Sequence, residues 1–149
     1  MRNENRSQLK ELKIEVAINL RFSDTDAMGV IWHGNYLRFF EDAREAFGNA
    51  YGLTYLDIYG NGYFTPIVKS DIDYKSPIYY GEKVNVIAKY IYSPAAKIIF
   101  EYEVVNISTK KVCAAGKTIQ VFLNAKERKL ELNKPDFYLR WEKAHDTER

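Results

Sequence analysis

Two aspartates, a histidine and two glycines crowd into one short stretch, "DTDAMGVIWHGNY", which runs from Asp24 to Tyr36. Asp26 could act as a nucleophile or a general base, because a carboxylate can attack a carbonyl carbon or deprotonate a water. Free carboxylates are weak bases with a pKa of about 4, so this chemistry works best on an already reactive acyl group. A thioester is such a group.

The same stretch leads into a predicted helix, with His33 and Gly34 at its start. A helix N-terminus presents unpaired backbone N–H groups and about half a positive charge. A carbonyl oxygen placed there is polarised, and negative charge that develops on it in a transition state is stabilised. The combination of Asp26 with this helix start therefore predicts a site for chemistry on a carbonyl group.

Two other interpretations of the stretch are a metal site and a simple turn. A calcium loop that starts at Asp24 needs Asp or Asn at its fifth position and Glu at its twelfth, and the chain has Met28 and Asn35 there. The chain contains only two histidines and one cysteine, so no zinc-type cluster is expected. We expect no metal and no other cofactor.

The simple-turn interpretation applies to part of the stretch. At least one aspartate is expected to hold a turn, and a histidine such as His33, taken alone, is more often structural.

The elements around the stretch indicate first a strand and then a helix. Apolar residues alternate with polar ones in "IEVAINLRF", a pattern typical of a half-buried strand, at Ile14, Val16, Ile18, Leu20 and Phe22. Apolar residues then follow at helical spacing up to Gly52, at Tyr36, Phe40, Ala43, Phe47 and Ala50. Leu37 and Phe39 widen this apolar arc, so more than one side of the helix must be covered.

The rest of the chain is predicted to be mostly strand. Turn-like separators divide four segments, "IVKSDIDY", "KVNVIAKYIY", "KIIFEYEVVNI" and "VCAAGKTIQVFL". Short turns imply antiparallel pairing, because parallel crossovers need a dozen or more residues. A short helix is expected from Pro135 and Asp136, with Phe137, Trp141 and Ala144 on one side. The order strand, helix, four strands, helix predicts an α+β fold, and its open sheet face and edges predict dimerisation.

Length and composition set limits on the protein. The 149 residues predict a single domain, 1–149, with a core over about residues 14–124. A net charge of +2, from 22 basic and 20 acidic residues spread along the chain, does not favour nucleic acid as a partner. The N-terminal "MRNENRSQLKELK" has no apolar core of a signal peptide, and no segment has the ~18 apolar residues of a membrane span. With one cysteine, we expect a cytoplasmic protein.

The segment "RFSDTDAMGVIWHGNYLRFFEDARE", Arg21 to Glu45, resembles the signature of the 4-hydroxybenzoyl-CoA thioesterase family, which includes the Tol-Pal-associated acyl-CoA thioesterases and has the hot-dog fold. "IDYKSPIYYGEKV" is similar to that family's second-strand and turn pattern, and the order of elements matches from roughly Ile14 to Leu123. The resemblance implies a curled antiparallel sheet around one long helix, dimers joined edge to edge, frequent tetramers, and active sites at subunit interfaces.

The resemblance also implies roles for single residues. Asp26 matches the catalytic nucleophile or general base, and His33 matches the position at the helix start where a backbone N–H or the side chain activates the thioester carbonyl. Gly34 belongs to the same helix start, and Asp24 is expected to hold the loop. The residues expected to contact substrate are Gly29, Val30, Trp32, Asn35 and Lys97.

The chain departs from the family pattern at two positions. Some members carry a tyrosine four residues before the catalytic aspartate, where this chain has Phe22. Some members also hold the CoA phosphates with basic residues in the turn between the third and fourth strands, where this chain has "SPAAKI" with Lys97 alone. The contact to the CoA phosphates therefore rests on one lysine.

The function expected from the sequence is hydrolysis of an acyl-CoA to a carboxylic acid and CoA, in the broad setting of lipid metabolism. An acyl-ACP substrate is one alternative, and a hot-dog dimer that binds acyl thioesters or a protein partner without turnover is another. The 12 tyrosines and 8 phenylalanines fit a core or an interface and do not by themselves indicate an aromatic substrate. Trp32, beside the helix start, is the ring most expected to touch the acyl group.

Overall fold

The computed structural model describes residues 11–147 of the chain. Most of the polar N-terminal segment that the sequence predicts before the first strand lies outside these residues. Within residues 11–147, no helix is long and apolar enough to cross a membrane.

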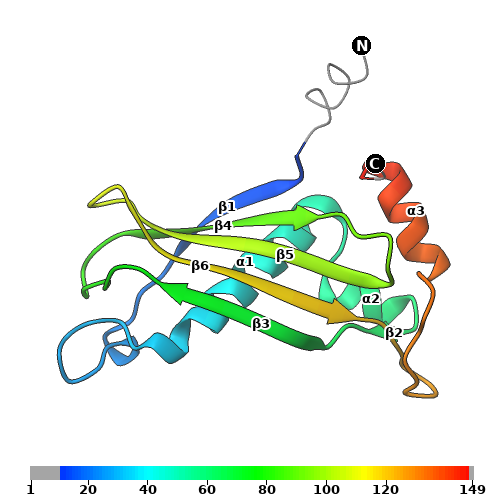
Figure 1. Cartoon of the computed structure of the whole chain (residues 1–149), viewed down its shortest axis with the longest axis horizontal. Coiled ribbons are helices and arrows are strands. Elements are labelled where there is room, and N and C mark those ends of the chain that lie inside the picture. Colours follow the sequence, from blue (N-terminus) through cyan, green and yellow to red (C-terminus); the bar gives the residue numbers. More distant parts are fainter. Residues whose placement is uncertain (1–10, 148–149) are drawn as a thin grey trace, which may run out of the picture.

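Five antiparallel strands form the main sheet in the order β1-β4-β5-β6-β3. Their bounds are β1 Lys13–Ile18, β3 Ile67–Tyr74, β4 Val84–Ile91, β5 Lys97–Asn106 and β6 Lys111–Val121. Every pairing is antiparallel, as the short turns predicted. One face of β4 and β5 is buried at alternate residues, while the intervening side chains point away from the helix. The two edges of the sheet are β1 and β3 (Figure 1).

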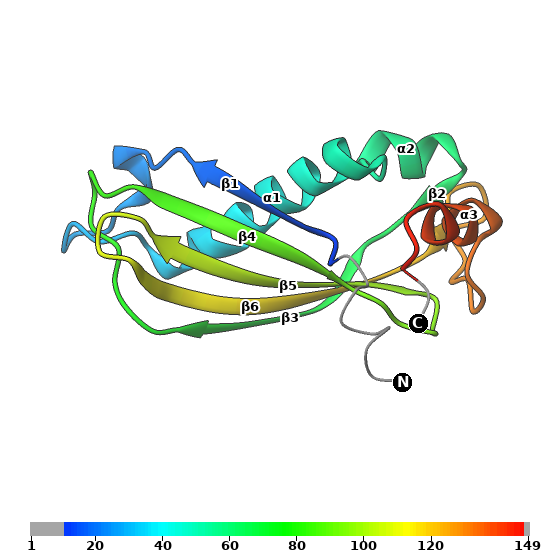
Figure 2. The same ribbon diagram turned by 90° about the horizontal axis from the view of Figure 1, so that it is seen from above.

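The helix α1, Tyr36–Tyr51, lies along the inner face of the curved sheet, and the strands wrap around it (Figure 2). Its buried side includes Phe39, Phe40 and Phe47, none of which is accessible to solvent. Gly52 ends the helix in the left-handed conformation, with φ of 75°, which a residue without a Cβ adopts at little cost. The prediction that Ala50 continues the buried stripe is wrong, because Ala50 is exposed to solvent.

The first strand is shorter than its alternating pattern predicted. β1 ends at Ile18, and Phe22 begins a short 3-10 turn, η1 (Phe22–Asp24), that bends the chain away from the sheet. The Phe22 side chain is 76% exposed instead of half-buried. The alternation of apolar and polar residues in the sequence thus continues past the point where the chain leaves the sheet.

Three short elements were not predicted. The helix α2 (Tyr55–Gly60) follows α1, and a small second sheet pairs β2 (Tyr63–Phe64) with β7 (Leu123–Asn124). Each is too short to leave a periodic pattern in the sequence. Together with α2, this small sheet extends the protein beyond the end of α1 (Figure 2).

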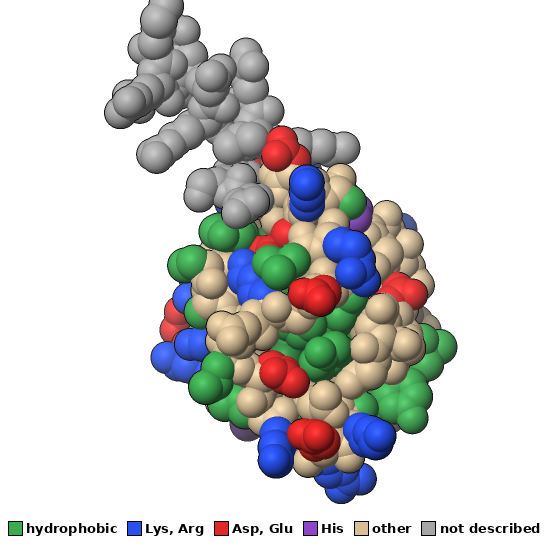
Figure 3. Space-filling view, turned by 90° about the vertical axis from the view of Figure 1, so that its right-hand side faces the viewer, with side chains coloured by type: hydrophobic (Ala, Val, Ile, Leu, Met, Phe, Trp, Pro, Cys, Tyr) green, Lys and Arg blue, Asp and Glu red, His purple; other side chains and the backbone are tan. Residues whose placement is uncertain are grey.

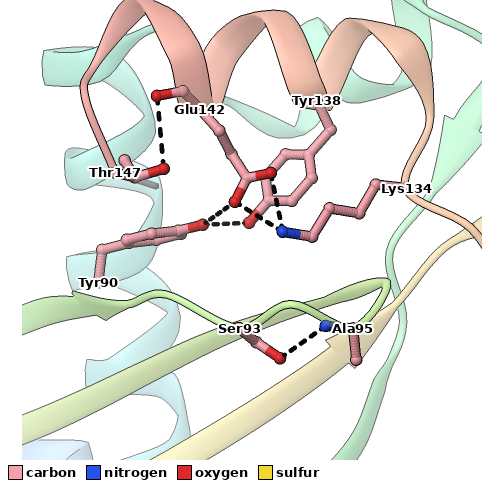
Figure 4. A network of polar contacts seen from close by, with 7 residues as sticks. All are labelled: Tyr90, Ser93, Ala95, Lys134, Tyr138, Glu142 and Thr147. Carbon is pink, nitrogen blue, oxygen red and sulfur yellow. Dashed lines mark hydrogen bonds and ion pairs between the residues drawn. The ribbon is translucent and has the colours of Figure 1, made fainter. Parts of the chain in front are cut away.

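The C-terminal helix α3, Asp136–Ala144, begins after Pro135 as predicted. Its buried side consists of Tyr138, Trp141 and Glu142, while Ala144, which the sequence placed on that side, is exposed. Figure 4 shows how Glu142 lies between Lys134 and the hydroxyl of Tyr90, so that a polar network joins α3 to the sheet. Seen from the end of the molecule that carries α3, apolar side chains lie in a hollow among charged ones (Figure 3).

Candidate functional site

The loop between β1 and α1 contains most of the residues expected to do chemistry, and it is folded on itself. Thr25 and Ile31 form an antiparallel bridge, and the Asp26 N–H donates to the Val30 carbonyl at 2.8 Å. Gly29 turns the chain between them with φ of 76°, a conformation that other residues rarely adopt. The loop is therefore a tight hairpin-like turn with Asp26 at its base.

The half-buried Asp26 carboxylate is held by backbone groups of its own turn. Its Oδ1 atom accepts the N–H of Met28 at 2.8 Å and, over a longer distance of 3.4 Å, that of Val30. Hydrogen bonds from backbone N–H groups fix the orientation of a carboxylate. This geometry fits a nucleophile or base that is fixed in place by the loop.

Asp24 has a different environment, because its carboxylate contacts both a cation and a backbone N–H of the loop. Its side chain is buried, 8% exposed, and pairs with the Arg38 guanidinium at 2.6 Å while accepting the Arg21 N–H at 2.9 Å. Its carbonyl oxygen accepts the Trp32 N–H at 2.9 Å and the Asn35 amide at 2.8 Å. Asp24 thus ties both arms of the loop to the first turns of α1.

The helix start consists of a short 3-10 turn, η2 (His33–Asn35), that continues directly into α1. The first N–H groups of such a turn lack acceptors within the helix, and here they belong to His33 and Gly34. The aromatic ring of Trp32 packs on Gly34 so closely that a Cβ there would come within 2.3 Å of the ring. A side chain at position 34 would force Trp32 to move, which explains the small residue at this point.

The His33 ring lies between two aromatic rings on the molecular surface. Its centroid is 5.2 Å from that of Trp32 and 6.0 Å from that of Tyr74, a residue at the end of β3. The Tyr74 hydroxyl donates to the His33 carbonyl oxygen at 2.9 Å. Nearby, burial raises the pKa of Tyr36 to about 12, so this phenol stays protonated at neutral pH.

A second segment supports the loop from the side. The Ile31 N–H donates to the Ile78 carbonyl at 2.7 Å, and Val30 forms a bridge with Tyr79. Exposed apolar side chains gather around these two segments, and Phe22 and Tyr80 meet edge to face at 5.6 Å. The exposed side chains are Phe22, Met28, Trp32, Tyr74, Tyr79 and Tyr80. So many exposed rings beside a polar loop are typical of a surface that binds a ligand or a partner.

The structure brings all but one of the predicted site residues together. The loop and helix start hold Asp26, Gly29, Val30, Trp32, His33, Gly34 and Asn35. Lys97 is exposed and lies elsewhere, because it begins β5 beside the far end of β4, whereas the loop contacts residues just before β4 begins. Within one chain, Lys97 therefore does not reach the Asp26 loop.

Two residues of this site were not predicted. Arg38 pairs with Asp24, but it lies fourteen positions further on, on the predicted helix, where an arginine is ordinarily a solvent-facing residue. Tyr74 occupies a strand position, and only the position of β3 beside the helix start brings it to His33. Neither residue leaves a local pattern that could have identified it.

Comparison with known proteins gives a consistent result. Residues 20–141 match the model of the thioesterase-like superfamily. YneP of Bacillus subtilis, to which acyl-CoA thioesterase activity is ascribed, is 33% identical over 94 residues, which cover 54% of this chain and 68% of that protein. The 1,4-dihydroxy-2-naphthoyl-CoA hydrolase of Nostoc punctiforme is 31% identical over 126 residues, covering 82% of this chain and 81% of the hydrolase.

Solved structures agree with these sequence matches. The DHNA-CoA thioesterase of Staphylococcus aureus superposes with a TM-score of 0.75 at 28% identity, covering 91% of each chain. The match is to the superfamily as a whole, so the narrower 4-hydroxybenzoyl-CoA and Tol-Pal-associated family stays a prediction. The chain belongs to the thioesterase-like superfamily and has its hot-dog fold.

Proposed function

We propose that the protein is an acyl-CoA thioesterase, which hydrolyses an acyl thioester to a carboxylic acid and CoA. The observation that carries the proposal is the arrangement of one loop, in which a carboxylate fixed by backbone N–H groups lies a few residues before an open helix start. The superfamily match and the names of the relatives support the same chemistry.

In the proposed mechanism, the thioester carbonyl oxygen binds at the N–H groups of His33 and Gly34. The positive end of α1 stabilises the negative charge that develops on this oxygen. Asp26 either attacks the carbonyl carbon, to form an anhydride that water then hydrolyses, or deprotonates the attacking water directly. In both routes CoA leaves as the thiol, and neither route requires a metal ion.

The other residues predicted to contact the substrate are considered relative to the helix start at which the thioester carbonyl binds. Gly29, Val30 and Asn35 shape the loop around the thioester, and the exposed Trp32 ring is proposed to contact the acyl group. Lys97 could meet the CoA phosphates only from a neighbouring subunit, because it is distant from the loop in its own chain. Its role therefore depends on the assembly.

We further propose that the protein forms dimers through β3. This strand is an edge of the sheet, and seven of its eight residues are exposed. An unpaired edge of this length offers backbone N–H and C=O groups to a second strand. Light scattering at micromolar concentration should give the mass of a dimer or a tetramer; a monomer would contradict this arrangement.

An acyl-ACP substrate is the second candidate for the carrier. It is favoured by the lack of a basic cluster beside Lys97, since the turn before it is "SPAA". The test compares the hydrolysis rates of one acyl group on CoA and on ACP. A faster reaction of the CoA ester supports the first candidate, and a faster reaction of the ACP ester supports the second.

The two proposed parts of the site can be separated by mutation. His33→Ala keeps the backbone N–H, so it should reduce kcat less than Asp26→Asn if the N–H alone binds the oxyanion. Loss of one oxyanion donor typically lowers kcat by about 10² to 10³. Equal and severe losses in both variants would place the His33 side chain in the chemistry. Tight acyl-CoA binding without thiol release by the wild type would instead indicate a binding protein.

A further inference from the structure

Three cations gather on a turn near the end of α2. Lys126, Arg128 and Lys129 are exposed on this basic turn (residues 125–129), which follows β7. Within residues 11–147, no carboxylate forms an ion pair with any of the three. Glu127 is the one acidic residue of the turn, so a net positive charge remains. Cations held close together without partners favour an anionic ligand.

Hydrogen bonds fix the shape of the basic turn. The Asn124 Oδ1 atom accepts the N–H groups of Lys126 and Glu127, both at 3.0 Å. The Arg128 N–H donates to the Asn124 carbonyl at 2.6 Å, and Arg128 has a φ of 56°, a conformation that few residues other than glycine adopt. The three cations therefore project from a backbone of defined shape.

A hollow beside the basic turn suits the base of a nucleotide. Its volume is about 640 Å³, and it lies between the turn and the end of α2. Tyr59 and Tyr63 line it, and Tyr59 is 52% exposed. Nucleotide bases stack on such rings, while lysine and arginine bind phosphates. Cations beside exposed rings thus fit a nucleotide phosphate, and CoA ends in one.

Within one chain, the basic turn is far from the thioester site. The pairing of β2 with β7 continues that of β3 with β6 beyond the first residue of β3, whereas Tyr74, the last residue of β3, contacts His33. Figure 1 shows the turn and the Asp26 loop at opposite ends of β3. Eight strand residues span about 26 Å. The pantetheine arm of CoA is about 15 Å long, like roughly four extended residues, and cannot cover this distance.

A dimer through β3 is constrained by the two faces of the strand. Ile72 pairs with Gly116, where a Cβ would contact the Phe40 ring, so Ile72 faces α1. Ser70 and Tyr74, two residues to either side, share that face. The residues that point to the opposite face are Lys69, Asp71 and Asp73. Directly opposite residues of an antiparallel pair lie on the same face, so like faces must meet in the dimer.

The charges on the outward face then favour one register. Two registers pair nearly the whole strand with itself, and both set Lys69 opposite an aspartate of the other copy. Placing Asp71 opposite itself also brings two carboxylates together, which is unfavourable. Placing Ser70 opposite itself brings no like charges together. In this register Tyr74 lies opposite the partner's Pro66.

This register brings the basic turn of the partner toward the thioester site. The partner's Pro66 is four residues from its Gly62, whose carbonyl accepts the Ala125 N–H of the turn at 2.9 Å. At 3.3 Å per residue and 4.8 Å between strands, the partner's turn lies roughly 17 Å from Tyr74. The pantetheine arm covers most of this distance, and the long side chains of the turn cover the rest.

We propose that Lys126, Arg128 and Lys129 of one subunit bind the phosphates of a CoA whose thioester lies at the Asp26 loop of the other subunit. This inference rests on the proposed thioesterase function and on the proposed β3 dimer, and it assigns the phosphate contact to a turn that the sequence did not single out. The three residues hold the substrate and take no part in the bond-breaking step.

The first test compares a carrier with phosphates and one without. Thiol release is measured for one acyl group on CoA and on pantetheine, which lacks the phosphates. Lys126→Gln combined with Lys129→Gln should raise KM for acyl-CoA by about tenfold or more at unchanged kcat, and should leave the acyl-pantetheine reaction unchanged. Arg128→Asn, which suits the left-handed conformation, should act in the same direction. The matched control, Arg140→Gln combined with Lys143→Gln, removes two exposed cations of α3 and should leave both reactions unchanged.

The second test asks which subunit supplies the cations. The Asp26→Asn chain and the chain with Lys126→Gln and Lys129→Gln are co-expressed with different tags, and mixed dimers are purified through both tags. One site of the mixed dimer then combines an intact Asp26 with an intact turn from the other chain. The mixed dimer should therefore hydrolyse acyl-CoA with the wild-type KM and about half the wild-type kcat. A KM that stays raised would overturn the action across the interface.

The third test addresses the register. Under mild oxidation, Ser70→Cys should give a disulfide-linked dimer, because directly opposite residues lie within disulfide range. Asp73→Cys, exposed on the same strand, should stay unlinked because its two copies lie far apart. Linkage through position 73 but not through position 70 would overturn the register.

Failure of the inference and failure of the proposed function give different results. An unchanged KM for acyl-CoA in the double lysine variant would overturn the phosphate site and leave the thioesterase proposal intact. Equal losses on acyl-CoA and acyl-pantetheine would also overturn it, because pantetheine carries no phosphate. Thiol release from neither carrier by the wild type would contradict the thioesterase proposal, and the inference would fail with it.

Discussion

The two aspartates of the loop differ in environment although they lie two positions apart. Asp24 is buried against Arg38, while Asp26 is half-buried and accepts hydrogen bonds from N–H groups of its own turn. The sequence predicted Asp26 as the reacting group from its place before the helix start, and the family resemblance implied the same role. The pairing of Asp24 could not be predicted locally, because Arg38 approaches only once η2 has turned the chain into α1.

Asp24→Asn should therefore reduce stability more than Asp26→Asn. Asn at position 24 removes the charge that Arg38 meets, and a hydrogen bond to a charged group is worth about 2 kcal/mol. Asn at position 26 keeps an oxygen that can accept the Met28 N–H, so its free energy of unfolding should change by less than about 0.5 kcal/mol. Urea unfolding of both variants measures this difference, and equal losses would contradict the structural role of Asp24.

At the scale of elements, the strands and the long helix were predictable because their patterns repeat. β4 and β5 alternate over eight and ten residues, and α1 repeats its apolar stripe until Gly52. The errors occurred at the ends of elements. The apolar pattern extends to Phe22, Ala50 and Ala144, and all three residues are exposed because the packed part of each element ends before them. For the site, the loop members were predictable together, but the distance of Lys97 from them depends on sheet topology, which a linear pattern does not contain.

The attachment of α3 depends on a buried ion pair. The Lys134 side chain is 8% exposed and that of Glu142 is 5% exposed, with Nζ within 2.9 Å of both carboxylate oxygens. Lys134→Ala would leave the Glu142 carboxylate buried without its cation, which should lower the free energy of unfolding by about 3 kcal/mol or more. Lys143→Ala, on the exposed side of the same helix, should change it by less than about 0.5 kcal/mol. Similar urea midpoints for the two variants would show that the ion pair does not hold α3.

At the scale of the whole molecule, buried phenols make stability depend on alkaline pH. Burial raises the pKa of Tyr36 to about 12, and it raises the pKa values of Tyr90, Tyr102 and Tyr138 above the ordinary tyrosine value of 10.0. Between about pH 10 and pH 12 the unfolded chain loses these protons while the folded chain keeps them. The folded state then binds more protons, so its stability falls as the pH rises.

The free energy of unfolding should accordingly be flat with respect to these groups below about pH 9 and should decline steeply above about pH 10. Urea midpoints measured from pH 8 to pH 11 test this dependence. Tyr36→Phe removes one of the four phenols and should make the decline shallower. A wild-type stability that is constant or rises through pH 11 would contradict the burial of these hydroxyls.

The central claim, that Asp26 hydrolyses a thioester at the start of α1, is tested most directly by free-thiol release. Short, long and aromatic acyl-CoA substrates are incubated with the wild type and with Asp26→Asn, whose fold is first compared by urea unfolding. We predict turnover of at least one substrate by the wild type and a loss of kcat by a factor of about 10² or more in Asp26→Asn. Equal rates in the two proteins would remove Asp26 from the mechanism and contradict the account.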